Sequence, residues 1–136
     1  MAYVVLDDPF LTVGGIDVSG VASQIALTKT QMNNTFTTFG SKGPSQVPSS
    51  LSAGDTVALT VHQDFDNAAI NSLFSFIGTN QTVVVRETTA SVSASNPEFT
   101  AVCAIVDNTP MSGNAGEVSP NSMTWPVDGA IEMTTS

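Results

Sequence analysis

Positive charge is the scarcest property of this 136-residue sequence, which has three Lys and Arg residues against twelve Asp and Glu. The formal net charge is −9, and charged residues make up 11% of the chain, where soluble domains average about 25%. Binding nucleic acid through its phosphates needs clustered cations, and Lys29, Lys42 and Arg86 are too few for such a patch. The sequence excludes that mode of binding, whereas a surface that repels nucleic acid remains compatible with it.

Cysteine and histidine occur once each, as Cys103 and His62. A single cysteine excludes an internal disulfide, and the two counts together exclude a Cys/His metal site. Cys103 lies in the apolar run Phe99–Val106, which predicts a buried structural thiol. The sequence has no G-x-S-x-G elbow and no glycine-rich nucleotide loop, and Asp64–Asn67 lacks the glycine and closing glutamate of a calcium loop. We therefore expect no catalysis, no cofactor and no metal.

Long apolar runs are also missing. No segment approaches 18 consecutive apolar residues, so no membrane span is predicted. The first ten residues lack the basic region and apolar stretch of a signal peptide, which indicates synthesis in a cytoplasm. The length fits one domain over residues 1–136, and a mean hydropathy of +0.17 is too high for a disordered chain.

The most regular stretch, Thr56–Glu87, predicts a strand, a helix and a second strand. Residues of Thr56–His62 alternate between apolar and polar or small, as in a half-buried strand. Asp64–Asn67 then supplies side chains that suit a helix N-cap, and Gly78 suits a helix stop, so we predict a helix over about residues 66–77. Thr82–Glu87 is rich in β-branched residues and predicts the second strand.

This helix has more apolar surface than one sheet covers. One stripe holds Phe65, Ala69, Leu73 and Phe76, and a neighbouring stripe holds Ile70, Phe74 and Ile77. Either the helix is wedged inside the core of its own chain, or the second stripe packs against another subunit. The pattern slightly favours the second explanation, which makes Ile70, Phe74 and Ile77 candidate interface residues.

Residues 31–55 predict a long loop, because Gly and Pro punctuate a stretch of Ser, Thr and Asn. A loop of this length is uncommon in a compact domain unless it has a function or is disordered. Phe36 and Phe39 give it more apolar content than a free linker tolerates. The segment is therefore either a flexible hairpin with a frayed tip or an arm that becomes ordered against a neighbour, and Phe36 and Phe39 are further interface candidates.

Two features complete the predicted β structure. Glu98–Val106 is apolar on both faces, which predicts a strand that is buried on both sides or lies in an interface. Ser122–Met133 predicts a closing hairpin that turns at Asp128-Gly129. Pro126 cannot donate to a ladder, so its strand should lie at a sheet edge or bulge, and Trp125 alternates with apolar neighbours as a core residue does.

Several phrases, in this order along the chain, resemble a known family. They are the segment TVALTVHQDFDNAAINSLFSFIG, the stretch Asn96–Val106, the loop pair Gly116-Glu117 and the ending Trp125–Gly129. Together they resemble the major tail proteins, or tail-tube proteins, of long non-contractile-tailed bacteriophages of actinobacteria. The resemblance covers most of the chain and includes no catalytic signature.

This resemblance implies a mainly β fold, a sandwich or barrel-like tail-tube domain with one flanking helix (about 66–77) and a long loop (31–55). It also implies hexameric rings that stack into a hollow tail tube, with the loop reaching the adjacent ring. The partners would be further copies of the chain, a tape-measure protein, and tail terminator and tip proteins. Genomic DNA would pass through the lumen without specific binding. The protein would be assembled in the host cytoplasm and found in the virion tail.

Other functions remain open at this point. A capsid-decorating or cementing protein is also β-rich and bound to an assembly, and a tail-completion protein would share the tail-tube fold. A carbohydrate-binding β-sandwich would present exposed aromatic residues, for which Tyr3 and Trp125 are the candidates.

Overall fold

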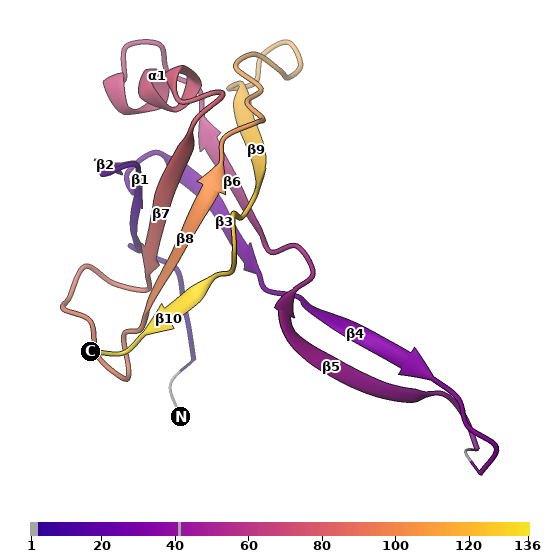
Figure 1. Cartoon of the computed structure of the whole chain (residues 1–136). Coiled ribbons are helices and arrows are strands. Elements are labelled where there is room, and N and C mark those ends of the chain that lie inside the picture. The colour runs from indigo at the N-terminus through magenta and orange to yellow at the C-terminus, as the bar shows by residue number, and fades with distance from the viewer. Residues whose placement is uncertain (1–2, 41) are drawn as a thin grey trace.

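The structure is a computed structural model that describes residues 3–40 and 42–136. Strands dominate it, as Figure 1 shows, and one helix lies at one end. The elements in chain order are β1 (Phe10–Val13), β2 (Ile16–Asp17), β3 (Ala22–Thr28), β4 (Gln31–Phe36), β5 (Ser45–Ser52), β6 (Thr56–His62), α1 (Ala68–Ser75), β7 (Asn80–Arg86), β8 (Glu98–Ala104), β9 (Pro120–Pro126) and β10 (Glu132–Thr134). The prediction of a mainly β fold with one helix is confirmed.

Two antiparallel sheets form the body of the molecule, and a third projects from it. The larger sheet has the order β10-β8-β7-β1-β2, and the smaller has the order β3-β6-β9. The hairpin β4-β5 is a separate two-stranded sheet that extends away from the body as an arm (Figure 1). Helix α1 connects β6 in the small sheet to β7 in the large one.

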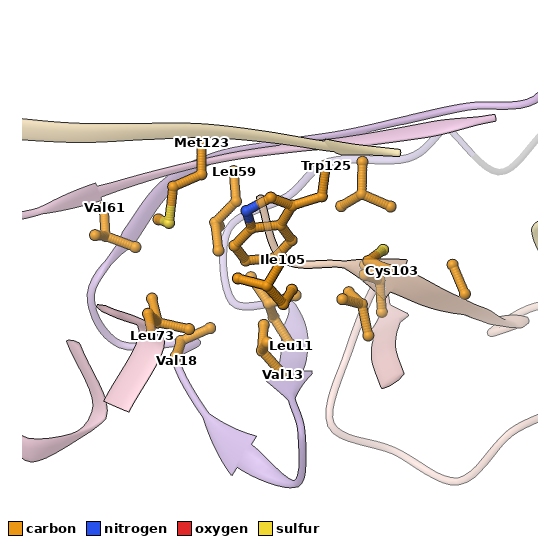
Figure 2. Close-up of a cluster of buried hydrophobic side chains, with 14 of the residues drawn as sticks. Leu11, Val13, Val18, Leu59, Val61, Leu73, Cys103, Ile105, Met123 and Trp125 are labelled. Atoms are coloured by element: carbon orange, nitrogen blue, oxygen red, sulfur yellow. The ribbon is translucent and has the colours of Figure 1, made fainter. Parts of the chain in front are cut away.

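The core lies between the two body sheets, because each contributes the buried side of an alternating strand. In the small sheet Leu59 and Trp125 are buried, while their strand neighbours face outward. From the large sheet Leu11 and Cys103 meet them (Figure 2). Trp125 is fully buried, and its indole N–H donates to the backbone carbonyl of Asp107 at 2.9 Å. Trp125 is therefore a core residue, as predicted, and not a sugar-stacking platform.

Cys103 is a buried free thiol, as predicted. Desolvation raises its pKa from 9.0 to about 11, so the reactive thiolate is disfavoured at neutral pH.

Helix α1 is shorter than predicted, starting and ending two residues inside the expected limits. Its N-cap is Asn67, whose side chain accepts hydrogen bonds from the backbone N–H groups of Ala69 and Ile70. The preceding acidic residues form a turn instead of a first helical turn, since the Asp66 N–H donates to the Asp64 carboxylate at 3.0 Å. At the other end Gly78 takes a φ of 88° just after the helix. Ile70 and Leu73 face the body and close one end of the core.

Residues 31–55, predicted as a long loop, contain a β-hairpin, which is one of the two alternatives that the sequence leaves open for this segment. Its two strands pair in antiparallel fashion, with Asn34 opposite Val47 and Phe36 opposite Ser45. Every residue of β4 is exposed, so neither face carries the alternation of apolar and polar residues that reveals a half-buried strand. Pro48 lies in the paired region, opposite Asn33 and next to a register shift.

The predicted closing hairpin over Ser122–Met133 is also wrong. Strand β9 pairs with β6, whereas β10 pairs with β8, so the segment crosses from one sheet to the other. The crossing is fixed at Val127, which bridges to Cys103, and at Asp128, whose N–H donates to Val102 at 2.7 Å. Asp-Gly thus supplies a local turn, with Gly129 at a φ of 94°, but does not determine which strand is paired afterwards. The edge position predicted for Pro126 is confirmed, because β9 is an edge strand.

Candidate assembly interface

Large exposed apolar side chains gather at three places: the N-terminal segment, with Tyr3, Val4, Val5 and Leu6, and the two places described next. The first, which we call the helix end, comprises α1, the segment 63–67 before it and the loop 105–119; its exposed apolar residues are Phe65, Phe74, Ile77, Val106, Met111 and Val118. The second is the arm, residues 31–52, where Met32, Phe36, Phe39, Val47 and Leu51 are exposed. The arm leaves the body at the side opposite α1 (Figure 1).

The prediction that Ile70 of the helix is an interface residue is wrong. Ile70 is only 1% exposed and belongs to the core of its own chain, so its side chain is not available to a partner. Each of the two alternatives for the helix, burial in its own core and contact with another subunit, therefore applies to some of its residues. Ile70 and Leu73 fill the core, while Phe74 and Ile77 are 57% and 42% exposed.

The two predicted residues of the arm are both exposed. Phe36 ends β4 at 50% exposure, and Phe39 lies in the connecting loop, residues 37–44, with a side chain free on all sides. The structure does not bring these residues near Phe74 and Ile77, because the arm and α1 lie at opposite ends of the molecule (Figure 1). The five predicted interface residues therefore fall into three groups. One belongs to the core (Ile70), two to the helix end (Phe74 and Ile77) and two to the arm (Phe36 and Phe39).

The base of the arm is held by Asp55, which sequence analysis missed. Its side chain is fully buried and accepts a hydrogen bond from the Thr30 N–H at 2.9 Å and another from the Ser52 hydroxyl at 2.9 Å. The second carboxylate oxygen accepts from the Ile131 N–H at 2.8 Å. One carboxylate thus ties both strands of the arm to the segment before β10.

Lys29 completes this anchor. Its ammonium nitrogen lies 3.7 Å from the Asp55 carboxylate and donates to the Ile131 carbonyl at 3.0 Å. The hydrogen bonds from Ile131 and Thr30 lower the pKa of Asp55, so the buried carboxyl is charged at neutral pH. A buried charge that is fully hydrogen-bonded favours one arrangement of its partners, which sets the direction of the arm.

An apolar groove of about 430 Å³ opens where the edges of the two body sheets face each other. Ile25 and Leu27 of β3 form one wall, and Phe99 and Met133 form the other. Lys29 and Arg86 also line it. Arg86 pairs with Glu98 at 3.3 Å and stacks on the Phe10 ring at 4.1 Å from its centre.

Comparisons with known proteins identify the fold. No family model and no curated protein matches the sequence. Among solved structures, a chain of an extracellular contractile injection system, the PVC sheath–tube complex in the extended state, is similar with a TM-score of 0.68 and 8% identity. The match covers 98% of this chain and 93% of that one. The cap of the anti-feeding prophage, described as a tube-terminating cap, is similar with a TM-score of 0.69 and 9% identity, over 100% of this chain and 93% of that one.

The chain has a tail-tube fold. Both neighbours come from contractile injection systems, whereas the sequence resembles proteins of non-contractile phage tails. The fold therefore supports the tail-tube part of that resemblance and does not distinguish the two kinds of tail. At identities of 8% and 9%, the likeness shows the fold alone.

Cations in this tail-tube fold are distributed unevenly. Lys29 and Arg86 are each engaged in an ion pair, with Asp55 and Glu98. Lys42 lies in the exposed loop at the tip of the arm and has no ion-pair partner among residues 3–40 and 42–136. The tip thus combines an unpaired positive charge with the bare ring of Phe39.

The outer face of the small sheet carries no Asp, Glu, Lys or Arg within β3, β6 and β9. Its rows run across β3, β6 and β9 as Gln24, Thr60 and Ser122, then Ala26, Ala58 and Thr124, then Thr28, Thr56 and Pro126. The outer face of the large sheet carries Asp17, Arg86, Glu98 and Glu132 instead. Small neutral side chains on a sheet face permit close approach of another surface.

A metal-binding cluster and a membrane-spanning helix are both absent from residues 3–40 and 42–136. No group of three or more His, Cys, Asp and Glu residues is placed to hold a metal there. Among the described helices, none is long and apolar enough to cross a membrane. The features that stand out are surfaces for association.

Proposed function

We propose that this protein is the structural subunit of a tail tube, with residues 1–136 forming one tail-tube domain. Subunits form hexameric rings, and the rings stack into the hollow tail tube through which DNA is delivered to a host. The observation that carries the proposal is a tail-tube fold whose anchored arm presents bare aromatic side chains away from its own body. Such an arm has no apolar surface of its own chain to cover it, and contact with another copy would cover it.

The second exposed surface supports the same assembly. Phe74 and Ile77 on the helix end lie opposite the arm, so each subunit offers two different contact surfaces. Contacts between unlike surfaces build rings or open stacks, in contrast to the self-complementary contact of a two-fold dimer. Phe36 and Phe39 on the arm, with Phe74 and Ile77 on the helix end, are the proposed interface residues.

The negative net charge of the chain suits the wall of a tube through which DNA passes. Six copies of a chain with net charge −9 bring about 54 negative charges to each ring, and like charge on a wall keeps DNA from adhering to it. Further copies of the chain, a tape-measure protein, and tail terminator and tip proteins are the proposed partners. The proposed location is the virion tail, after assembly in the host cytoplasm, and the role involves no catalysis.

Electron microscopy of the purified protein, together with sedimentation, tests this function. We expect six-fold rings or filaments with a central hole. Two results together would falsify the proposal: the purified protein stays monomeric at high concentration, and the tails of intact particles lack such rings. Trimers would instead favour a capsid-decorating protein.

A second candidate, a tail-completion protein that closes the tube, has a specific observation in its favour. The tube-terminating cap of the anti-feeding prophage has the same fold at a TM-score of 0.69. A closing protein forms a single ring at one tube end, so labelling in intact particles separates the two functions. Antibody density along the whole tail indicates a tube subunit, and density at one end only indicates the completion protein.

A further inference from the structure

The inner face of the large sheet is left partly uncovered. One row of this face consists of residues that lie opposite one another on β1, β7, β8 and β10, namely Leu11, Val85, Phe99 and Met133. Opposite residues of paired strands point to the same face, yet exposure rises along the row, from 0% at Leu11 and 7% at Val85 to 61% at Met133. The small sheet therefore does not cover the full width of the large one, and the apolar groove of about 430 Å³ opens at the uncovered end.

The N-terminal segment Tyr3–Leu6, which we call the strap, lies beside this groove without filling it. The strap and β10 are at the end of the body away from α1 (Figure 1). Val4 and Leu6 line the groove, although they are 69% and 50% exposed. Tyr3 and Val5, which alternate with them, do not line it. This alternation is that of an extended chain with one face toward the groove.

Few contacts fix the strap in this position. It belongs to no strand or helix, and the Val5 N–H donates to the Glu87 carboxylate at 3.5 Å, which is long for a hydrogen bond. Residues 3–9 make no other hydrogen bond within the part of the chain that the structure describes. The strap can therefore move relative to the groove without disrupting secondary structure.

We propose that the groove is a binding site for the chain's own strap, which closes over it and inserts Val4 and Leu6 against Phe99 and Met133. One movement then covers both the uncovered end of the sheet and two exposed side chains of the strap, and burial of apolar surface favours it. Closure takes place within one subunit, so it does not depend on the tube function proposed above. A closed subunit presents less apolar surface to other chains before it assembles.

Covalent connection favours the strap over a free apolar molecule or a second copy as the occupant. Residues 7–9 alone separate the strap from β1, and Val4 and Leu6 already lie at the groove. A tether of this length gives an effective concentration on the order of millimolar, which a separate molecule would have to exceed.

The charges of the groove are also compatible with this occupant. Its two cations, Lys29 and Arg86, are ion-paired with Asp55 and Glu98. The strap carries no charged side chain, so its insertion leaves both pairs intact and brings no unpaired charge into an apolar site.

Thiol labelling with N-ethylmaleimide measures closure in the full-length protein. Met133→Cys places a thiol in the groove, and Val102→Cys, which is on the outer face of the same sheet at 39% exposure, is the matched control. The natural Cys103 is buried and does not compete. We expect residue 133 to be labelled about tenfold more slowly in the natural chain than when Tyr3–Leu6 is replaced by Ser-Gly-Ser-Gly, and residue 102 equally in both.

Equal labelling of residue 133 with and without the natural strap means that the strap stays open, and it overturns the proposal. Protection that appears only as the protein concentration rises means that another copy covers the groove, and it overturns closure within one subunit as well. Neither measurement requires tubes to form, so the result is independent of the proposed function.

Thermal unfolding tests the same contact from the side of the strap. We expect Leu6→Ser to lower the melting temperature by about 4 °C, and Val5→Ser, at a position that does not line the groove, to change it by less than about 1 °C. Leu6→Ser combined with Met133→Ser should lower it by less than the sum of the two single changes, because each removes the same contact. Additive effects, or equal effects of Leu6→Ser and Val5→Ser, would show that the strap does not enter the groove.

Discussion

Asp55 shows how a single buried side chain sets the position of a whole element. Its carboxylate receives hydrogen bonds from Thr30, Ser52 and Ile131, which lie on three separate segments. Without it, two backbone N–H groups at the base of the arm lose their acceptor, and each buried donor left unpaired costs about 1–3 kcal/mol. This role cannot be predicted from the sequence, because Gly54-Asp55 has the composition of an ordinary turn.

We expect Asp55→Ala to lower the free energy of unfolding by about 3 kcal/mol at pH 7. The effect should depend on pH. The folded pKa of Asp55 lies below the value of about 3.9 of an unfolded chain, so its contribution is present above that value and is lost as pH falls through the folded pKa. Denaturant unfolding of the wild type and the variant between pH 7 and pH 2 should therefore show a difference that narrows in acid.

The control for this titration is Asp8→Ala, which removes an exposed carboxylate that has no hydrogen-bond partner among residues 3–40 and 42–136. It should leave the unfolding free energy within about 0.5 kcal/mol of the wild type. A gap between Asp55→Ala and wild type that stays constant down to pH 2 would show that Asp55 contributes through packing and not through its charge.

At the scale of the element, α1 places core and surface residues next to each other. Leu73 is fully buried and Phe74 is 57% exposed, although they are consecutive. We expect Phe74→Asp to weaken assembly with little change in melting temperature, since its ring contacts solvent in the isolated subunit. The matched change Leu73→Asp puts a charge into the core and should prevent stable folding. Thermal unfolding and sedimentation measure the two effects separately.

If Phe74→Asp lowers melting temperature as much as it lowers assembly, the side chain is part of the subunit core. The interface assignment on the helix would then fail for Phe74 as it already has for Ile70, which is buried.

The arm gives a second test at this scale. Replacing residues 37–44 by a two-residue Asn-Gly turn keeps β4 and β5 paired but removes Phe39 and Lys42. We expect a folded subunit, because the exposed tip contributes nothing to the core, and we expect tube stacking to be lost. Circular dichroism and electron microscopy are the measurements. Unfolding of the shortened chain would instead show that the tip supports the fold.

The strands that could be predicted from sequence are those with one buried face. Thr56–His62 was identified because Val57, Leu59 and Val61 alternate with small or polar residues, and that alternation is what burial of one face produces. The arm strands have no buried face, so their pattern is that of a loop. The partner of β10 was missed because it is set by distant contacts, including the bond from Ile131 to Asp55.

The candidate site was predictable only in its exposed part. The excess of apolar residues on the helix indicated an interface, but which side chains the core takes depends on how α1 is rotated over the sheets. That rotation buries Ile70 and leaves Phe74 outside. The hollow lined by Phe65 and Met111 gave no signal in sequence, because the two residues are 46 positions apart and line it together only in the folded chain.

At the scale of the whole molecule, assembly brings together subunits that each carry a net charge of −9. Long-range repulsion between them is screened by salt, with a Debye length of about 30 Å at 0.01 M and about 10 Å at 0.1 M. The contacts proposed for Phe36, Phe39, Phe74 and Ile77 are apolar, so salt does not screen them. Repulsion should therefore weaken faster than attraction as salt rises.

We expect the concentration needed for tube formation to fall several-fold between about 0.01 M and 0.15 M salt, because repulsion over more than a Debye length is removed in that range. Sedimentation of the wild type across a salt series measures it. Lys42→Glu should need more salt than the wild type to assemble, since it changes the net charge of each subunit by −2 and so adds to the repulsion. Assembly of the wild type that weakens steadily with salt would mean that ion pairs, and not apolar contacts, provide most of the stability of the tube.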